Sequence, residues 1–410
     1  MTNAQRTSGP PAGSAAPGGW SAPTVQPSGG SHSRAAKEPA HGAAPSSSGT
    51  LRFAQLVLLE IAAAAIVAGI AGKHAWVIVG IAVGAPCALL ALVPVQRRWL
   101  YQVLVSRLRM SARRRDQRRY PGLASLVGPY EVVDVATSGG SSIAVVRSGT
   151  TWALPLELRQ DSIFNDDAPV PLTGLTSLLT IEDVALASIR LLTFVTPPTV
   201  APGAPSGPTP VLAKTATRYC VLTLDSLRAA PALAARGGSD AAAAQILRRC
   251  AMRAEEVLGS ASLRVSTLDE GGVHRLLDSC LGPATTVTGR GATATSETSS
   301  GIRIGGTYSS SVAVGGGAGA ALRRLAEILP YLPGRVAATA LVVTPGRREG
   351  GAQSALLVRV SAPDDQTSPA LAGELTRRID KAGLPVQRLG GEQGVLLRAS
   401  TPLGFSEGMS

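Results

Sequence analysis

The stretch that decides the fold is residues 218–270, "RYCVLTLDSLRAAPALAARGGSDAAAAQILRRCAMRAEEVLGSASLRVSTLDE". It opens with "RYCVLTLDS", which predicts a β-strand. The segment "SDAAAAQILRRCAMRAEEVLG" predicts a helix that starts at Ser239 or Asp240 and ends at Gly259. The apolar face of this helix consists of Leu247, Cys250, Ala254 and Val257. A second strand, "LRVSTLD", follows, so the stretch is a strand–helix–strand unit.

A later stretch repeats this plan. The strand is "SALLVRVSA", the helix is "SPALAGELTRRIDKAG", and the second strand is "PVQRL". Leu371, Leu375 and Ile379 line one face of the helix, and Gly383 closes it. The two stretches share too little sequence to indicate a duplication. Two such units predict an α/β (α+β) domain.

Strands also precede the first unit. Residues 130–158, "YEVVDVATSGGSSIAVVRSGTTWALPLEL", predict a small β-meander of three strands, and "LASIRLLTFVT" predicts another strand. The Pro-rich residues 197–210 predict an exposed loop inside one domain, because the sequence on both sides is β-rich. We therefore expect one cytosolic α/β domain over residues 121–404, followed by a short tail, residues 405–410.

Two apolar runs near the N-terminus predict a membrane protein. Residues 51–71 and 75–95 are each long enough to cross a bilayer as a helix, so residues 51–95 predict a two-helix transmembrane hairpin. The preceding residues 1–50 are rich in Pro, Gly and Ser, and they predict a disordered tail. The hairpin predicts a multi-pass plasma-membrane protein with both termini in the cytoplasm.

The arm that follows the second span, residues 96–120, carries nine arginines and no lysine. Such an excess of cationic residues keeps a flank cytoplasmic and meets anionic lipid headgroups. Either a helix on the membrane surface or a solvated charged stalk fits the pattern. A nucleic-acid partner is not expected, because aromatic residues do not alternate with the basic ones. The candidate membrane or partner contacts of the arm are Arg97, Arg98, Trp99, Tyr101, Arg107, Arg109, Arg113, Arg114, Arg115, Arg118 and Arg119.

Glu60 lies inside the first predicted span. A carboxylate at the middle of a bilayer costs about 3 kcal/mol, so it either contacts a partner helix or is a polar residue tolerated near the interface. Both interpretations remain open.

Residues for catalysis are scarce. The four cysteines stand far apart, and His274 is the one histidine of the predicted folded domain. No nucleophile elbow, metal-ligand cluster or nucleotide P-loop is present in the sequence. Asp166–Asp167 and Asp364–Asp365 keep one alternative open, a membrane-anchored glycosyltransferase-like enzyme with an Asp-Asp metal and sugar-nucleotide site. Turn residues are the simpler interpretation, so we expect no enzyme, no metal and no cofactor.

The chain resembles the EccE family of actinobacterial type VII (ESX) secretion systems in the order and sequence of its segments. These segments are the tail, the hairpin, the arginine-rich arm, the meander, "LASIRLLTFVTP", residues 218–270 and the ending "AGLPVQRLGGEQGVLLRASTPLG". The resemblance covers about residues 51–404. It implies a non-catalytic structural subunit of a plasma-membrane secretion complex, with EccB, EccC and EccD as partners.

Overall fold

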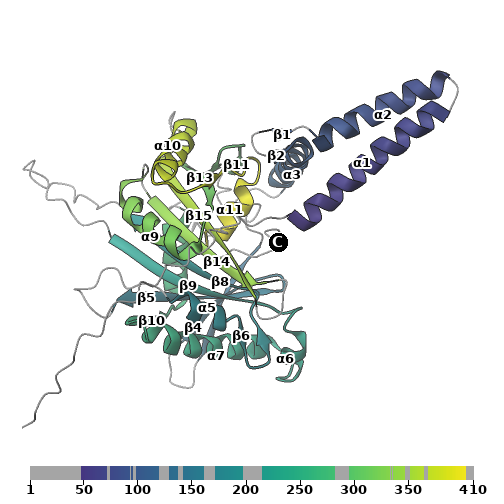
Figure 1. Ribbon diagram of the computed structural model, residues 1–410. Helices are drawn as coiled ribbons and strands as arrows, with labels where there is room; N and C mark the ends of the chain where they lie inside the picture. The colour runs from purple at the N-terminus through teal and green to yellow at the C-terminus, as the bar shows by residue number, and fades with distance from the viewer. Residues whose placement is uncertain are drawn as a thin grey trace, which may run out of the picture. The chain divides into compact units, whose positions relative to one another are not determined.

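The computed structural model shows a wide β-sheet with helices on both of its faces (Figure 1). The described residues are 48–71, 74–92, 94–95, 98–119, 129–136, 142–160, 171–196, 215–281, 295–332, 334, 336–346, 351–363 and 368–402. Of the predicted N-terminal tail, residues 1–50, residues 1–47 lie outside them and residues 48–50 are helical. The predicted C-terminal tail, residues 405–410, and the Pro-rich loop also lie outside them.

The described part of the sheet has twelve strands, and all of their pairings are antiparallel. Ten of them follow the order β11-β12-β13-β15-β14-β8-β9-β5-β4-β3, while β10 pairs with β5 and β16 with β13. The strands are β3 (Glu131–Ala136), β4 (Ser142–Ser148), β5 (Thr151–Gln160), β8 (Ser188–Thr196), β9 (Thr215–Asp225), β10 (Leu263–Thr267), β11 (Thr295–Glu297), β12 (Ile302–Ile304), β13 (Thr307–Val314), β14 (Val336–Pro345), β15 (Ala352–Pro363) and β16 (Val386–Gln387).

Helices alternate with these strands along the chain. They are α5 (Leu172–Ser177), α6 (Ala230–Ala234), α7 (Asp240–Gly259), α8 (Glu270–Leu281), α9 (Ala318–Ile328), the 3-10 helix η1 (Leu329–Tyr331), α10 (Ser368–Lys381) and α11 (Gln393–Ala399). A small separate hairpin, β6 (Thr180–Ile181) and β7 (Val184–Ala185), follows α5. The prediction of a mixed α/β domain is confirmed, with a large antiparallel sheet at its centre.

The domain is built twice from one plan. The first copy runs β3-β4-β5-α5-β8-β9-α7-β10-α8, and the second runs β11-β12-β13-α9-β14-β15-α10-β16-α11. The four strands of the core of each copy lie in the order β10-β5-β9-β8 and β16-β13-β15-β14. Each core is a split βαβ arrangement of the ferredoxin-like kind. Pairing of β8 with β14, for example Leu191 with Leu341, joins the two copies into one sheet.

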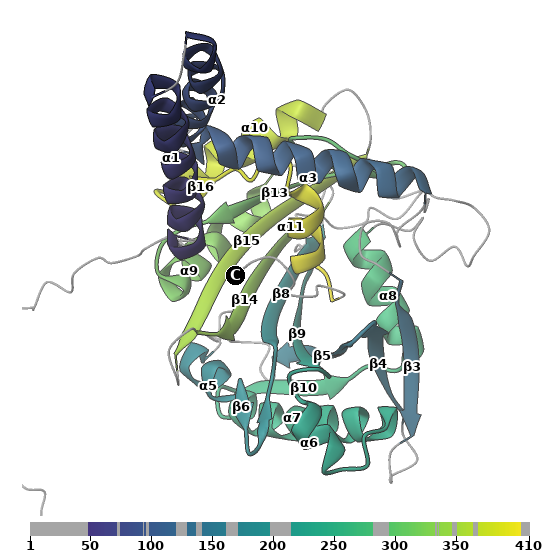
Figure 2. The same ribbon diagram turned by 90° about the vertical axis from the view of Figure 1, so that its right-hand side faces the viewer.

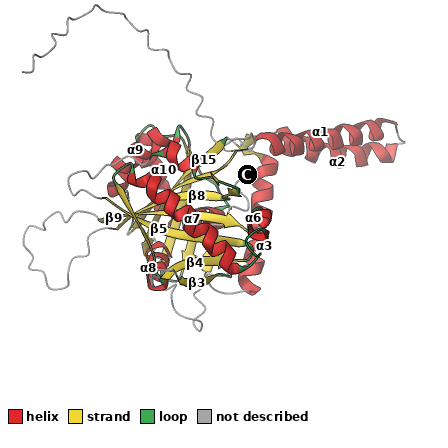
Figure 3. Ribbon diagram, turned by 90° about the horizontal axis from the view of Figure 1, so that it is seen from below, coloured by secondary structure: helices red, strands yellow, loops and turns green. Residues whose placement is uncertain are grey.

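The two faces of the sheet carry two different hydrophobic cores. Helices α5, α7, α9 and α10 cover one face with the larger core, and Figure 3 shows α7 lying across the strands. Helices α8 and α11 cover the other face, and they lie in front of the sheet in Figure 2. The strands bury side chains on both faces, which explains why β8 reads as an almost continuous apolar run.

The prediction for α7 is confirmed in detail. Ser239 is its N-cap and accepts a hydrogen bond from the backbone N–H of Ala242. Leu247, Cys250 and Ala254 are buried in the larger core, with Val257 partly buried beside them. The three apolar residues predicted for α10 are buried in the same core. The predicted meander is confirmed as β3, β4 and β5.

Two helices, α1 (Ser48–Ala71) and α2 (His74–Leu92), correspond to the predicted hairpin and pack against each other. Within the described residues, no helix combines the length and the apolar character that crossing a bilayer requires. The membrane spans are therefore not confirmed. The second span was also predicted to reach residue 95, whereas α2 ends at Leu92, because Pro94 lacks the N–H that a continuing helix needs.

The arm forms a helix of its own. A short strand pair, β1 (Pro94–Val95) and β2 (Arg98–Trp99), separates α2 from α3 (Leu100–Arg119). The arm is thus helical, but it does not continue the second helix of the hairpin.

Candidate functional site

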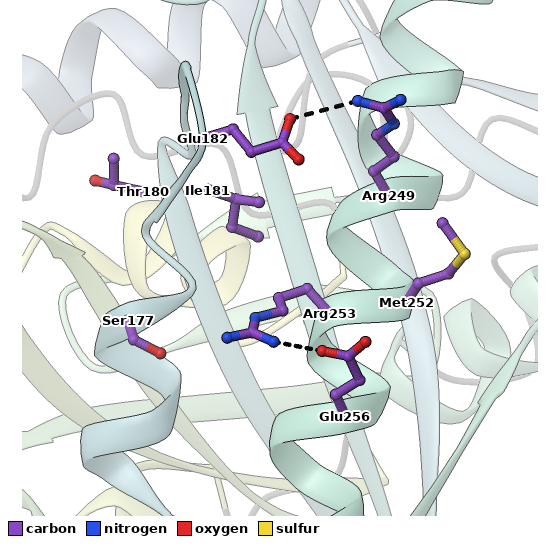
Figure 4. A pocket seen from close by; sticks show the side chains of 8 residues that line it. All are labelled: Ser177, Thr180, Ile181, Glu182, Arg249, Met252, Arg253 and Glu256. Carbon is purple, nitrogen blue, oxygen red and sulfur yellow. Dashed lines mark hydrogen bonds and ion pairs between the residues drawn. The ribbon is translucent and has the colours of Figure 1, made fainter.

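A hollow of about 570 Å³ lies on the surface of the first copy, between α7 and the β6–β7 hairpin (Figure 4). Its walls carry cationic, anionic, hydroxyl and apolar side chains. They are Ser177, Thr180, Ile181, Glu182, Arg249, Met252, Arg253 and Glu256. The second copy has no described counterpart of the β6–β7 hairpin, because η1 and then β14 follow α9 there. The hollow is therefore an addition to the duplicated plan.

Ion pairs fix the β6–β7 hairpin against the neighbouring helices. The Nη1 group of Arg249 lies 3.4 Å from Oε2 of Glu182. Arg236 donates to both carboxylate oxygens of Asp183, at 2.9 and 2.8 Å, and this hydrogen bonding lowers the pKa of Asp183. Arg236 also donates to the carbonyl of Ala232 in α6. Both residues of the hairpin turn are thus held by an arginine.

The turn itself is strained at Glu182. Its φ is +55°, in the left-handed region where side chains with a Cβ are disfavoured. A two-residue hairpin turn of this kind usually has glycine there. Outliers of this kind often mark sites where function, and not stability, selects the residue.

Lower in the hollow, Arg253 pairs with Glu256 on the same helix (Figure 4). The side chains of both pairs are about 60% exposed, at 60% and 63% for Arg249 and Glu182 and at 59% and 65% for Arg253 and Glu256. Exposed pairs of this kind contribute little to stability, about 0–1 kcal/mol. These residues are consequently available for contacts with another molecule.

Two arginines lie inside the sheet, on the face covered by α8 and α11. Arg190 of β8 and Arg359 of β15 are both 1% exposed. Burial lowers the pKa of Arg190 to about 9. Its Nη2 group donates to Ser188 Oγ at 3.1 Å, while its Nη1 group and the hydroxyl of Thr223 have no hydrogen-bond partner among the described residues.

The guanidinium of Arg359 makes fewer hydrogen bonds than that of Arg190. None of its three guanidinium nitrogens makes a hydrogen bond of ordinary geometry with a described residue. The thiol of Cys280 on α8 lies near enough to influence the guanidinium, but burial dominates and lowers the pKa of Arg359. Burial also raises the pKa of Cys280 to about 12, so this thiol stays protonated and supplies no counter-charge.

Most residues predicted to contact the membrane or partners fall on α1 and α3, while Arg98 and Trp99 form β2 and Arg97 lies outside the described residues. Glu60 is exposed on α1, Tyr101 is buried, and Arg107 and Arg115 are exposed on α3. Their roles stay predictions. The side chains of Arg97, Arg98, Trp99, Arg109, Arg113, Arg114, Arg118 and Arg119 lie outside the described part.

The catalytic candidates do not come together among the described residues. His274 is partly buried on α8, with its Nε2 atom 3.6 Å from Oε1 of Glu270 one turn away. Cys220, Cys250 and Cys280 are buried and unbonded to one another. Asp166–Asp167 and Asp364–Asp365 lie outside the described part. No group of three or more potential metal ligands occurs in the part of the chain that is described.

Sequence reasoning missed the two buried arginines and the β6–β7 hairpin. The signal for the arginines was present, since each interrupts an apolar run, in "LASIRLLTFV" and in "ALLVRVSA". An arginine is almost never fully buried unless it is paired, so such a position inside a predicted strand deserves a functional or structural explanation.

The middle of this domain is similar to a family of secretion-system proteins. The family model described as "Putative type VII ESX secretion system translocon, EccE" matches residues 213–314, from β9 to the end of β13. This match confirms the resemblance to the EccE family over that segment. No curated protein matches the chain.

Proposed function

We propose that this chain is a non-catalytic structural subunit of a type VII (ESX) secretion membrane complex. The observation that carries the proposal is the EccE family match over residues 213–314. The matched segment includes β9, α7 and the strands that begin the second copy of the domain. The duplicated domain is a wide sheet covered by helices on both faces. Its surfaces can therefore serve as contact surfaces for other subunits.

The surface of α1 and α2 supports a membrane location. Large apolar side chains of both helices are exposed, up to 75% for Ile70. They are Leu56, Ile61, Ile66, Val67 and Ile70 on α1, and Val77, Ile78, Val79, Ile81, Val83, Leu89 and Leu92 on α2. An apolar surface of this extent marks a membrane or protein contact. Each predicted span also includes side chains outside the described part, at residues 51–55 in the first span and at residues 75–76 and 93–95 in the second.

On this proposal the hairpin lies in the plasma membrane, and both termini lie in the cytoplasm. The exposed Arg107 and Arg115 of α3 support contact of the arm with anionic lipids, since cationic residues next to a membrane each contribute about 1 kcal/mol to such binding. The proposed protein partners are EccB, EccC and EccD.

Affinity purification of the tagged full chain from membranes tests the proposal. We expect EccB, EccC and EccD to co-purify with the chain in mild detergent, and we expect deletion of residues 51–95 to leave the chain unbound to the membrane. Recovery of the full chain without any of the three proteins would contradict the secretion-complex proposal.

The non-catalytic part of the proposal has a separate test. Asp166, Asp167, Asp364, Asp365 and His274 are each replaced by Ala, and secretion is measured in cells. We expect secretion to continue in all five variants. Loss of secretion in one Asp variant, together with metal-dependent binding of a sugar nucleotide by the parent chain, would favour the glycosyltransferase-like alternative.

A further inference from the structure

We infer that the hollow between α7 and the β6–β7 hairpin binds an acidic helical segment of a partner protein, with two carboxylates that pair with Arg249 and Arg253. This inference goes beyond the proposed function, which names no contact surface on the domain. It holds for any protein that presents such a segment, so it does not depend on the secretion role.

The spacing of the two arginines sets the geometry. Arg249 and Arg253 are four residues apart on α7, so they lie on the same face one turn apart. In Figure 4 the Arg253 side chain extends from α7 across the hollow, whereas the Arg249 side chain runs beside α7 and pairs with Glu182. A partner helix that lies along α7 and carries carboxylates at positions i and i+4 matches this spacing.

The donors of both arginines favour an anionic ligand. A guanidinium has five N–H donors and no acceptor. The ion pairs of Arg249 with Glu182 and of Arg253 with Glu256 both use Nη1. Among the described residues these contacts leave donors on the remaining edge of each group for an incoming carboxylate. Because both pairs are well exposed, a carboxylate can also displace either glutamate at little cost in free energy.

Apolar side chains lie between the charged ones. Met252 is 51% exposed, and Ile181 lies opposite in the wall formed by the β6–β7 hairpin. The flexible thioether of Met adapts to apolar partners of different shape. The ligand therefore combines two carboxylates with one apolar side chain between them. A hollow of about 570 Å³ holds a few side chains of this kind.

The position of the hollow in the fold supports a binding role. The strained turn at Glu182 belongs to the hairpin that is added to the first copy alone among the described elements. The hairpin adds no strand to the large sheet, because β6 and β7 pair only with each other, and it is anchored through Val184, which is buried in the larger core. The chain as a whole carries a net charge of +12, which favours encounter with acidic partners.

Peptide binding to the full chain in detergent tests the inference. The probe is a fluorescent amphipathic helical peptide of about 20 residues, with Glu at i and i+4 and Leu between them. The matched peptide has Gln in place of both Glu residues. By fluorescence anisotropy we expect the Glu peptide to bind, and we expect the Gln peptide to bind at least about tenfold more weakly. We also expect the affinity for the Glu peptide to fall as salt is raised.

Variants of the chain locate the binding. The double variant Arg249→Glu/Arg253→Glu is expected to lower the affinity for the Glu peptide by at least about tenfold. Arg323→Glu on the exposed surface of α9 is the matched control and should leave it unchanged. Glu182→Gln/Glu256→Gln should raise the affinity by about threefold, because it frees both guanidinium groups. A purely structural role of these ion pairs predicts no such gain.

Three outcomes would overturn the inference. The first is equal binding of the Glu and Gln peptides, and the second is unchanged binding by the double Arg variant. The third is loss of binding to phosphatidylglycerol vesicles in that variant while neither peptide binds, which would make the hollow a lipid site. Arg249→Gln/Arg253→Gln, checked by circular dichroism, repeats the test without charge reversal and so separates lost contacts from lost folding.

Discussion

The side chain of Gln393 takes the place of a neighbouring strand for the backbone of Ser311. Its Oε1 atom accepts from the N–H of Ser311 at 2.9 Å, and its Nε2 group donates to the carbonyl of Ser311 at 3.1 Å. On this edge of β13, pairing with β12 ends at Ser309 and pairing with β16 begins at Ala313. One amide from α11 therefore fills the gap between two strands.

The first prediction concerns this contact. Gln393→Ala should lower the free energy of unfolding by about 2–3 kcal/mol, because it leaves a buried N–H and C=O without partners. Gln393→Glu should cost more, since a carboxylate faces the carbonyl of Ser311. Urea unfolding followed by the fluorescence of the buried Trp152 measures both changes. Gln353→Ala on an exposed position of β15 is the control, and an equal loss there would refute the argument.

The second prediction concerns Arg359. Its guanidinium is fully buried without a hydrogen-bond partner among the described residues. Burying this charge costs free energy that no hydrogen bond offsets, and an apolar side chain of similar length removes that cost. Arg359→Met should raise the free energy of unfolding by about 1–4 kcal/mol. Arg323→Met on the surface should change it by less than about 0.5 kcal/mol. A loss of several kcal/mol in Arg359→Met would instead show that an anion balances the charge.

The third prediction is a loss of stability in alkaline solution. Burial raises the pKa of Cys220 from 9.0 to about 12. The unfolded chain therefore loses this proton at a lower pH than the folded one, and the stability contribution present below pH 9 is lost between pH 9 and 12. Burial lowers the pKa of Arg190 from 12.5 to about 9. Above pH 9 the unfolded chain keeps this proton while the folded chain loses it, so the contribution of Arg190 to stability increases with pH and opposes that of Cys220.

Cys220→Ala isolates the contribution of the thiol. The slope of unfolding free energy against pH should become less negative by up to about 1.4 kcal/mol per pH unit above pH 9. Urea titrations at a series of pH values measure this slope. Cys87→Ala removes a thiol outside the buried core, and it should leave the slope as in the parent chain. Identical slopes for the parent and Cys220→Ala would rule out the buried thiol as the cause.

The fourth prediction concerns the close packing of α1 on α2. A Cβ at Gly80 would lie 2.5 Å from the carbonyl oxygen of Ala65, closer than real contacts allow, and 3.0 Å from Cα of Gly69, which is also a tight contact. Gly80→Val should therefore push the two helices apart. Spin labels on the exposed Ile61 and Ile81 should then give a longer and broader distance distribution. Ala82→Val on the exposed side is the control, and the same distribution in both variants would contradict the close contact.

The helices and strands with strong local patterns could be predicted from the sequence. Ser239, Leu247 and Gly259 define α7 through capping and periodicity, which act over a few residues. The duplication could not be predicted in this way. It rests on pairings such as Leu191 with Leu341, and an alternating pattern does not specify which distant strand is the partner.

The candidate site was missed for a local reason. A two-residue turn between short strands is usually recognised by glycine or asparagine at the position with positive φ. The sequence "TIEDVA" has Glu182 there, and the ion pair of Asp183 with Arg236 holds the turn instead. Contacts between distant segments therefore replace the local signal that a sequence pattern could have detected.

The last prediction returns to Glu60. It is exposed on α1, whereas Ala62 is buried against α2, so the hairpin itself does not enclose the carboxylate. In a bilayer such a group favours a donor from a neighbouring helix of a complex. Glu60→Leu should therefore insert at least as well as the parent chain but recover less of the complex on affinity purification at matched membrane expression. Ala63→Leu, which adds apolar bulk at an exposed position nearby, is the control and should recover the complex as the parent does. If Glu60 instead reaches the cytosolic interface, the Glu60→Leu variant will recover as much complex as the control, and the idea of a contact inside the membrane is wrong.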